Sequence, residues 1–207
     1  MKDKIILIGG GGHCKVIIDA IINADKYDIE GVLDSKFNVD FKILGFSIIG
    51  GDDKLPEIRG RGVKNAFVSV GSIGKYALRR HIYEKVKIFK FNVPVIIHPR
   101  SVVAYDVSID EGTFVAASAT INSGTRIGKN VIVNTSSSID HDCVIGDFAH
   151  VSPGVILCGG VSVGEGTHIG VGAKVIQGVH IGKDCFIKAG HTVCGNVAAG
   201  SVYPGEK

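Results

Sequence analysis

A histidine flanked by two carboxylates is the most chemically suggestive feature of the sequence. The stretch reads Asp140-His141-Asp142 and is followed at once by Cys143. Because the ordinary pKa of histidine is near neutral, an exposed imidazole can remove a proton from a substrate. A neighbouring carboxylate fixes its tautomer and raises its basicity. The stretch fits a general base, and a solvated turn histidine without catalytic work fits the same residues.

A six-residue repeat forms the elements that must position this histidine. Every sixth residue from Val103 to Val193 is Val, Ile or Leu, and these residues are called anchors below. The residue after an anchor is often Gly, Asn or Asp, and the residue four places after it is mostly small. One inward branched residue, one small residue and one turn per hexad predict a parallel β-helix with three hexads per coil, in which residues 18 apart stack.

The anchor register predicts where each reactive side chain lies. His141 is two residues past an anchor, which indicates a turn or an outward face. Cys143 has the small, inward register, which argues against an acyl-cysteine intermediate. His150 and His168 share one register, five residues past an anchor, and are 18 residues apart, so they should stack on adjacent coils. His180 has the same register but should lie on another face.

The chain before the repeat predicts a separate α/β domain with a parallel sheet. The predicted strands are 4–8, a run ending at 33, and 66–70, with 87–91 as a candidate fourth strand. The predicted helices are 16–24 and 76–86. The period changes between Pro94 and Pro99. We therefore predict one domain over residues 1–94 and a second, the β-helix, over residues 95–207.

A glycine run, Gly9 to Gly12, follows the first predicted strand. Glycines at a helix start allow a phosphate to approach the backbone amides. Cys14 replaces the third glycine of the dinucleotide fingerprint, and the strands are too few for a complete dinucleotide fold. Half such a fold can hold one nucleotide, with Asp34 at the end of the second strand near base or ribose. A tight turn without a ligand fits as well.

Composition excludes several other classes. The 207 residues carry a net charge of +3 without a marked basic run, which gives no support for binding nucleic acid or an anionic membrane. No stretch approaches the length of a membrane span, and the first apolar run is too short for a signal peptide. Five cysteines without a C-x-x-C pair argue against disulfides and zinc knuckles. We expect a cytoplasmic protein.

Several motifs together resemble the acetyl-CoA-dependent nucleotide-amino-sugar N-acetyltransferases. They are the glycine run ending at His13, Val32-Leu33-Asp34, Val68-Ser69-Val70-Gly71, Asn134-Thr135-Ser136-Ser137, Ile139 to Gly146 and His150 to Gly154. The resemblance implies a Rossmann-like βαβ domain followed by a left-handed parallel β-helix. It also implies N-acetylation of a UDP-4-amino-sugar type of substrate for bacterial surface glycans. The sialic acid O-acetyltransferase branch has the same layout, and a structural or sensing solenoid is the non-enzymatic alternative.

The resemblance implies a role for each matching residue. His141 would deprotonate the sugar amine, Asp142 would raise the basicity of His141, and Asn134 would orient the site. The implied acetyl-CoA contacts are His150, Gly159 and Val171. The implied nucleotide-sugar contacts are Gly11, Gly12, His13, Asp34, Ser35 and Gly71.

The resemblance also bears on metals and partners. Zinc-bearing β-helices use three histidines, two of them five residues apart, and no histidine pair here has that spacing, so we expect no metal. The family is trimeric with acetyl-CoA between neighbouring solenoids, which implies a homotrimer with inter-subunit active sites. The chain departs from the family by lacking Pro-Ala after Gly205. The nucleobase, the sugar and the acyl group are not readable from the sequence.

Overall fold

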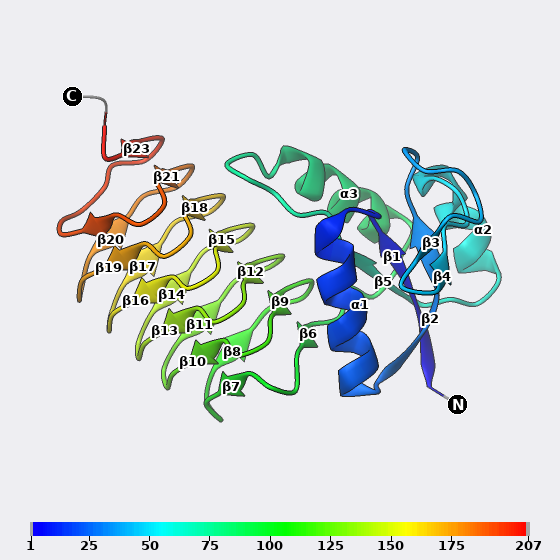
Figure 1. Ribbon diagram of the computed structural model, residues 1–207, viewed down its shortest axis with the longest axis horizontal. Coiled ribbons are helices and arrows are strands. Elements are labelled where there is room, and N and C mark those ends of the chain that lie inside the picture. Colours follow the sequence, from blue (N-terminus) through cyan, green and yellow to red (C-terminus); the bar gives the residue numbers. More distant parts are fainter. Residues whose placement is uncertain (1, 206–207) are drawn as a thin grey trace. The chain divides into compact units, whose positions relative to one another are not determined.

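The computed structural model describes residues 2–205. The chain groups into two compact units by its internal contacts (Figure 1). One unit runs up to Ser72 and resumes from Ala77 to Ile96, and the other comprises Ile73–Tyr76 and the chain from Ile97 onward. No helix within residues 2–205 combines the length and apolar character needed to cross a bilayer.

The first unit is built on a three-stranded parallel sheet with β1 in the middle. Its strands, in sheet order, are β2 (Tyr27–Leu33), β1 (Asp3–Ile8) and β5 (Asn65–Val68). The remaining elements are α1 (Gly12–Ala24), a hairpin of β3 (Lys42–Ile43) and β4 (Phe46–Ser47), η1 (Asp52–Lys54), α2 (Leu55–Gly60) and α3 (Ala77–Ile88). The last four residues of β1 are fully or almost fully buried. Each such side chain contributes about 1.5–3 kcal/mol of transfer free energy, so the sheet centre anchors the glycine turn that follows.

The candidate fourth strand at 87–91 does not form, so that prediction is wrong. Helix α3 continues to Ile88, and Lys90 then adopts a left-handed φ of 58° that ends the helix. Lys87 and Ile88, the first two residues of the predicted strand, are instead the last two residues of this helix. Only a single bridge, between Asn65 and Asn92, adds to that edge of the sheet.

The second unit is a parallel β-helix, as the hexads predicted, and the fold class is confirmed. One sheet holds β7 (Val102–Val103), β10 (Thr120–Ile121), β13 (Ser138–Ile139), β16 (Ile156–Leu157), β19 (Lys174–Val175) and β22 (Thr192–Val193). A second holds β8 (Ser108–Ile109), β11 (Arg126–Ile127), β14 (Val144–Ile145), β17 (Ser162–Val163) and β20 (His180–Ile181). The third holds β6 (Ile96–Ile97), β9 (Phe114–Val115), β12 (Ile132–Val133), β15 (His150–Val151), β18 (His168–Ile169), β21 (Phe186–Ile187) and β23 (Val202–Tyr203).

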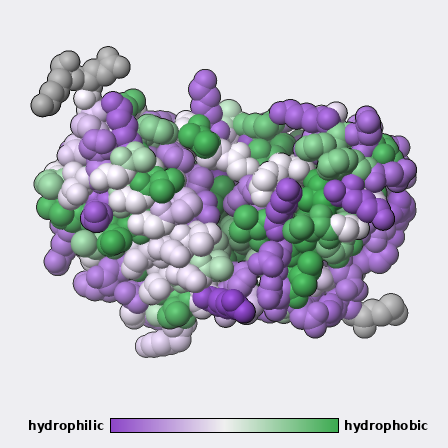
Figure 2. All heavy atoms as spheres, in the orientation of Figure 1, coloured by the Kyte–Doolittle hydropathy of each residue, from purple (hydrophilic) through white to green (hydrophobic). Residues whose placement is uncertain are grey.

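The anchors fill the interior of this β-helix. Paired strands join residues 18 apart, as in Ile121 with Ile139 and Ile139 with Leu157, so each anchor stacks on another. Anchors and inward small residues form one continuous buried cluster. The solenoid face visible in Figure 2 consists mostly of white and pale purple residues with scattered green ones. The interior of the stack, not this surface, therefore holds most of the apolar side chains.

The turns between strands use a left-handed residue three places past most anchors. Glycine fills many of these positions because it adopts a positive φ without steric cost. Ser, Asn or Asp fills others, and Asp142, with a φ of 59°, is one of them. Phe148, with a φ of 58°, is the bulky exception.

Buried threonines close several turns and explain part of the small-residue register. Thr125 donates its hydroxyl to the carbonyl of Asp140 at 2.9 Å and accepts the amide of Cys143 at 3.1 Å. Thr113 and Thr167 make the same pair of bonds on other coils. These hydroxyls satisfy backbone groups that the turn would otherwise bury without partners.

We expect Thr125→Val to destabilise the protein by about 1–3 kcal/mol, because the buried amide of Cys143 loses its acceptor. Denaturant titration at one fixed protein concentration measures the change in unfolding free energy. Thr125→Ser keeps the hydroxyl and serves as the control. Equal stability of the valine and serine variants would contradict the prediction.

Candidate active site

His141 is the first residue of the turn between β13 and β14, and its side chain is 54% exposed. This confirms the outward position that the register predicted. Its Nδ1 lies 2.8 Å from Oδ2 of Asp142. An ionised carboxylate only accepts hydrogen bonds, so Nδ1 donates the proton in this pair. In the neutral form of the ring, the basic nitrogen is therefore Nε2, away from Asp142.

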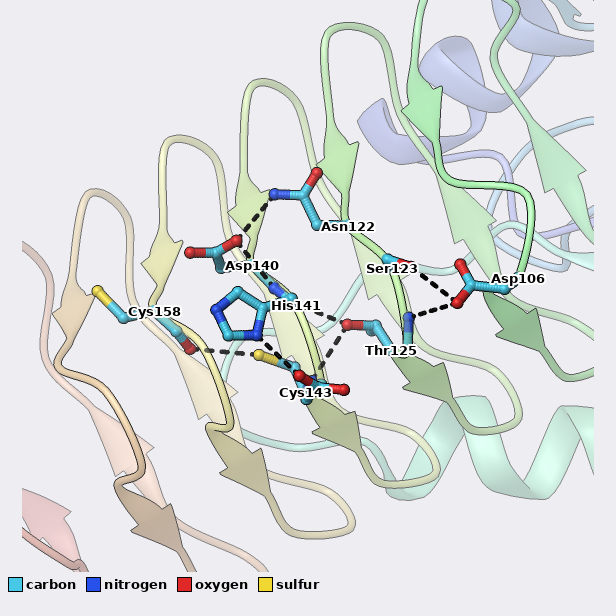
Figure 3. A network of polar contacts seen from close by, with 10 residues as sticks. Asp106, Asn122, Ser123, Thr125, Asp140, His141, Cys143 and Cys158 are labelled. Carbon is cyan, nitrogen blue, oxygen red and sulfur yellow. Dashed lines mark hydrogen bonds and ion pairs between the residues drawn. The ribbon is translucent and has the colours of Figure 1, made fainter.

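A second carboxylate, Asp140, holds the backbone of the same turn. Its Oδ1 accepts the amide of His141 at 2.9 Å and Nδ2 of Asn122 on the adjacent coil at 2.9 Å (Figure 3). These two bonds lower the pKa of Asp140, that of Asn122 contributing most. The sequence singled out Asp140 only as a carboxylate next to His141 and gave no role to Asn122. The 18-residue spacing between positions 122 and 140, which stacks them on adjacent coils, was the signal that could have paired them.

The two carboxylates raise the pKa of His141 above its ordinary 6.5. The largest cause is the hydrogen bond from Nδ1 to Asp142, and the attraction of Asp140 follows. A base must be neutral to accept a proton, so a raised pKa moves the acidic limb of the activity profile to higher pH.

We expect Asp142→Asn to shift the acidic limb of kcat/KM to lower pH. Asparagine also tolerates the left-handed backbone at this position, so the change removes charge and leaves the turn intact. Below the unfolded pKa of His141 the pair with Asp142 also stabilises the fold, and this contribution disappears as pH rises through the folded pKa. A kcat/KM profile from pH 5 to 9 and parallel unfolding curves test both effects; a limb that stays in place or moves to higher pH would refute the assignment.

Gly159, one coil from His141 in the same register, forms the surface against which the imidazole lies. A Cβ at Gly159 would stand 2.5 Å from Nε2 and 2.6 Å from Cε1 of His141. The amide of Gly160 also donates to the carbonyl of His141 at 2.9 Å, which joins the two coils at this corner. Asp142 on one side and Gly159 on the other thus define the position of the ring.

The other solenoid residues singled out from sequence form a separate group. Nδ2 of Asn134 lies 3.1 Å from Nε2 of His150, and the rings of His150 and His168 meet edge to face at 4.8 Å between centroids. His150 and His168 pair on adjacent strands of the third sheet, as predicted, and His180 lies in the second sheet. Val171 is in the turn after β18 and is 55% exposed.

These two groups occupy different corners of the coil. His141, Asp142 and Gly159 lie where the first sheet passes into the second, whereas Asn134 and Val171 lie where the third sheet passes into the first. Consecutive corners of a triangular coil face different directions. A single chain therefore does not bring all the predicted catalytic and acetyl-CoA residues together.

In the α/β unit, His13 lies in the first turn of α1 beside Gly71. A Cβ at Gly71 would be 3.3 Å from the Cβ of His13, so these two predicted contacts are neighbours. Helix α1 begins after Gly11 without a side-chain cap, and Gly12 is its first residue. Burial, with a smaller effect of Arg79, lowers the pKa of His13 to about 4, so the imidazole is neutral near pH 7. It can donate one hydrogen bond but carries no charge.

Asp34 ties the glycine turn to the end of β2. Its Oδ2 accepts the amide of Gly10 at 2.7 Å, and its Oδ1 accepts the amide of Lys36 at 2.8 Å. Ser35 follows in the same loop and lies close to Gly51. Asp34 thus organises the turn in addition to any contact with a ligand.

Within residues 2–205, no cluster of three or more His, Cys, Asp or Glu side chains is arranged to hold a metal ion.

Both parts of the chain match known protein families. Residues 4–86 match the model of the PglD N-terminal domain, and residues 160–194 match the hexapeptide repeat of succinyl-transferase. UDP-N-acetylbacillosamine N-acetyltransferase of Bacillus subtilis (strain 168) is 33% identical over 114 residues, which are 55% of this chain and 51% of that protein. The chain thus spans about half the length of this curated relative.

Two solved structures match over nearly their whole length. Perosamine N-acetyltransferase from Caulobacter crescentus, crystallised as a histidine-to-asparagine variant with CoA and GDP-perosamine, is 36% identical with a TM-score of 0.91, covering 96% of this chain and 92% of that chain. The acetyltransferase domain of PglB from Neisseria gonorrhoeae FA1090, in complex with acetyl coenzyme A, is 31% identical with a TM-score of 0.88, covering 100% and 99%. The resemblance noted in the sequence is thereby confirmed, and the chain belongs to the nucleotide-amino-sugar N-acetyltransferase family.

Proposed function

We propose that the protein transfers the acetyl group of acetyl-CoA to the amino group of a nucleotide-linked amino sugar. The observation that carries this proposal is the exposed imidazole of His141, held between Asp142 on Nδ1 and Gly159 on the Nε2 side of the ring. Relatives that align over more than nine-tenths of their length carry CoA, acetyl-CoA or a nucleotide amino sugar, which supports the choice of both substrates.

The reaction follows from the chemistry of the two substrates. The nitrogen lone pair of the amine attacks the thioester carbonyl carbon while Nε2 of His141 takes a proton from the nitrogen. The C–S bond then breaks, the amide remains on the sugar, and CoA thiolate accepts the proton from His141. Bringing both substrates together supplies much of the acceleration, and the base adds about 10²–10⁴-fold. No residue of the protein is acylated, in keeping with the buried position of Cys143.

The α/β unit would hold the nucleotide sugar. The uncapped start of α1 at Gly11 and Gly12 would receive the phosphates, and neutral His13 would donate a hydrogen bond beside Gly71. Asp34 and Ser35 would border the base, with Asp34 fixing the turn through Gly10. This assigns residues 1–94 to the acceptor and residues 95–207 to acetyl-CoA and catalysis.

The active unit would be a homotrimer. His141 and its partners lie at one corner of the coil, and Asn134, His150 and Val171 lie on the third sheet and its following corner. Packing three solenoids side by side would bring the His141 corner of one subunit next to the Asn134 and His150 side of a neighbouring subunit. Acetyl-CoA would then bind between the two subunits. We place the reaction in the cytoplasm, before the sugar enters a bacterial surface glycan.

Thiol release tests this function directly. The protein is mixed with acetyl-CoA and either GDP- or UDP-linked 4-amino sugars, and free CoA is followed with a thiol reagent. We expect CoA to be released only when the amino sugar is present. Mass spectrometry should find one equivalent of N-acetylated sugar for each CoA released. Release only with hydroxyl acceptors such as sialic acid would favour O-acetylation, and no release with any acceptor would favour a structural or sensing solenoid.

A further inference from the structure

A four-residue segment between β5 and α3 leaves the α/β unit. Ile73 to Tyr76 belongs by its contacts to the solenoid, although the chain on either side belongs to the α/β unit. Ile73 is 83% exposed, so burial of this apolar side chain does not explain the excursion. The segment is held instead by Gly74 and Tyr76, and a Cβ at Gly74 would be 3.0 Å from the ring of Phe186.

Tyr76 sits in a socket formed by three stacked turn residues. Phe148, Gly166 and Asp184 occupy the same turn position on three successive coils, 18 residues apart. The rings of Tyr76 and Phe148 stack with 5.8 Å between centroids, and the Tyr76 hydroxyl donates to Oδ1 of Asp184 at 2.9 Å. Gly166 forms the floor, since a Cβ there would overlap the Tyr76 ring. The ring stacking, the hydrogen bond and the close approach to Gly166 together fix the position of the Tyr76 side chain.

Phe148, whose ring forms one wall of the socket, has an unfavourable backbone conformation. Phe148 has a φ of 58°, a left-handed backbone that costs a bulky L-residue about 1–2 kcal/mol. Other turns of this solenoid place Gly, Ser, Asn or Asp there. A strained residue that persists at one turn indicates a purpose beyond closing that turn. Phe148 is 7% exposed and its ring stacks on Tyr76, which accounts for the choice of an aromatic residue.

The chain connects this socket to both halves of the proposed reaction. Only Ser72 separates the docked segment from Gly71, which lies beside His13 in the α/β unit. On the solenoid, Phe148 is two residues before His150. Resting on the proposed function, we propose that Tyr76 is a positioning residue: by docking in its socket it restrains the backbone of the loop from Gly71 to Tyr76, and with it the acceptor contact at Gly71.

Kinetic separation of binding from turnover tests this role. In Tyr76→Ala we expect kcat with the best nucleotide-linked amino sugar to fall about 10- to 100-fold, since small misplacement of a reacting group has effects of this size. The Kd of each substrate, measured separately by calorimetry, should remain within about twofold, because each binding surface is intact. Tyr76→Phe, which loses only the bond to Asp184, should fall between wild type and Tyr76→Ala.

Gly166→Ala disrupts the same socket through a change in the solenoid. It should reproduce the loss in kcat of Tyr76→Ala. The double variant should have nearly the same kcat as either single variant, because both changes remove the same interaction. Gly200→Ala is the matched control, since Gly200 has the same left-handed backbone with open space around it. An unchanged kcat in Tyr76→Ala, or equal behaviour of Gly166→Ala and Gly200→Ala, would overturn the inference. Wild-type protein that releases no thiol would instead remove the proposed function, and with it this role of Tyr76.

Discussion

His141→Asn is expected to lower kcat by about 10²–10⁴-fold, the usual contribution of a positioned general base. Asparagine fits an exposed turn and keeps a polar side chain beside Asp142, so the β-helix should fold as before. The KM for acetyl-CoA and for the nucleotide sugar should change little, because the lost interaction is made mainly in the transition state. Initial rates of thiol release at saturating substrate measure the effect.

His191→Asn is a suitable control for this change. His191 is also an exposed solenoid histidine, and its Nδ1 lies 2.9 Å from the carbonyl of Ala189, within its own turn. It should retain wild-type kcat and an equal unfolding temperature. A His141→Asn variant that keeps more than about a tenth of wild-type kcat would rule out His141 as the base, since general-base catalysis contributes more than this.

The arrangement of the solenoid could be predicted from sequence because its signal is repeated. Each hexad independently specifies one inward branched residue and one turn, and the error at any single position is corrected by the others. The inward register of Cys143, the outward turn at His141 and the pairing of His150 with His168 all followed from counting along the chain. The α/β unit has no such redundancy, and the short run at 87–91 was mistaken for a strand.

The particular side-chain contacts across coils and between distant segments could not be predicted in the same way. The bond from Asn122 to Asp140 and the contact of Gly159 with His141 depend on side-chain direction at one corner. Tyr76 reaches a socket at Asp184, more than a hundred positions along the chain. The resemblance implied only a contact of Gly159 with acetyl-CoA, and the structure adds that the ring of His141 lies against it.

Gly159→Ala is expected to lower kcat about 10²-fold without unfolding the protein. The new methyl group would occupy the space of the His141 ring, at 2.5 Å from Nε2. The imidazole is the free end of an exposed side chain and can rotate away at little cost in stability. Its Nε2 then no longer faces the substrates, and a displacement of about 1 Å is enough for a loss of this size.

Comparison with a second glycine separates this effect from a change of backbone. Gly195 also lies outside the left-handed region and has open space around it, so Gly195→Ala should leave kcat unchanged. Adding Gly159→Ala to His141→Asn should cost almost nothing further, because the methyl group acts only by displacing a ring that is already absent. Additive losses in the double variant would mean that Gly159 acts on acetyl-CoA directly. Full activity in Gly159→Ala would show that the imidazole is catalytic in another rotamer. The position of the ring between Asp142 and Gly159 would then not be the catalytic one.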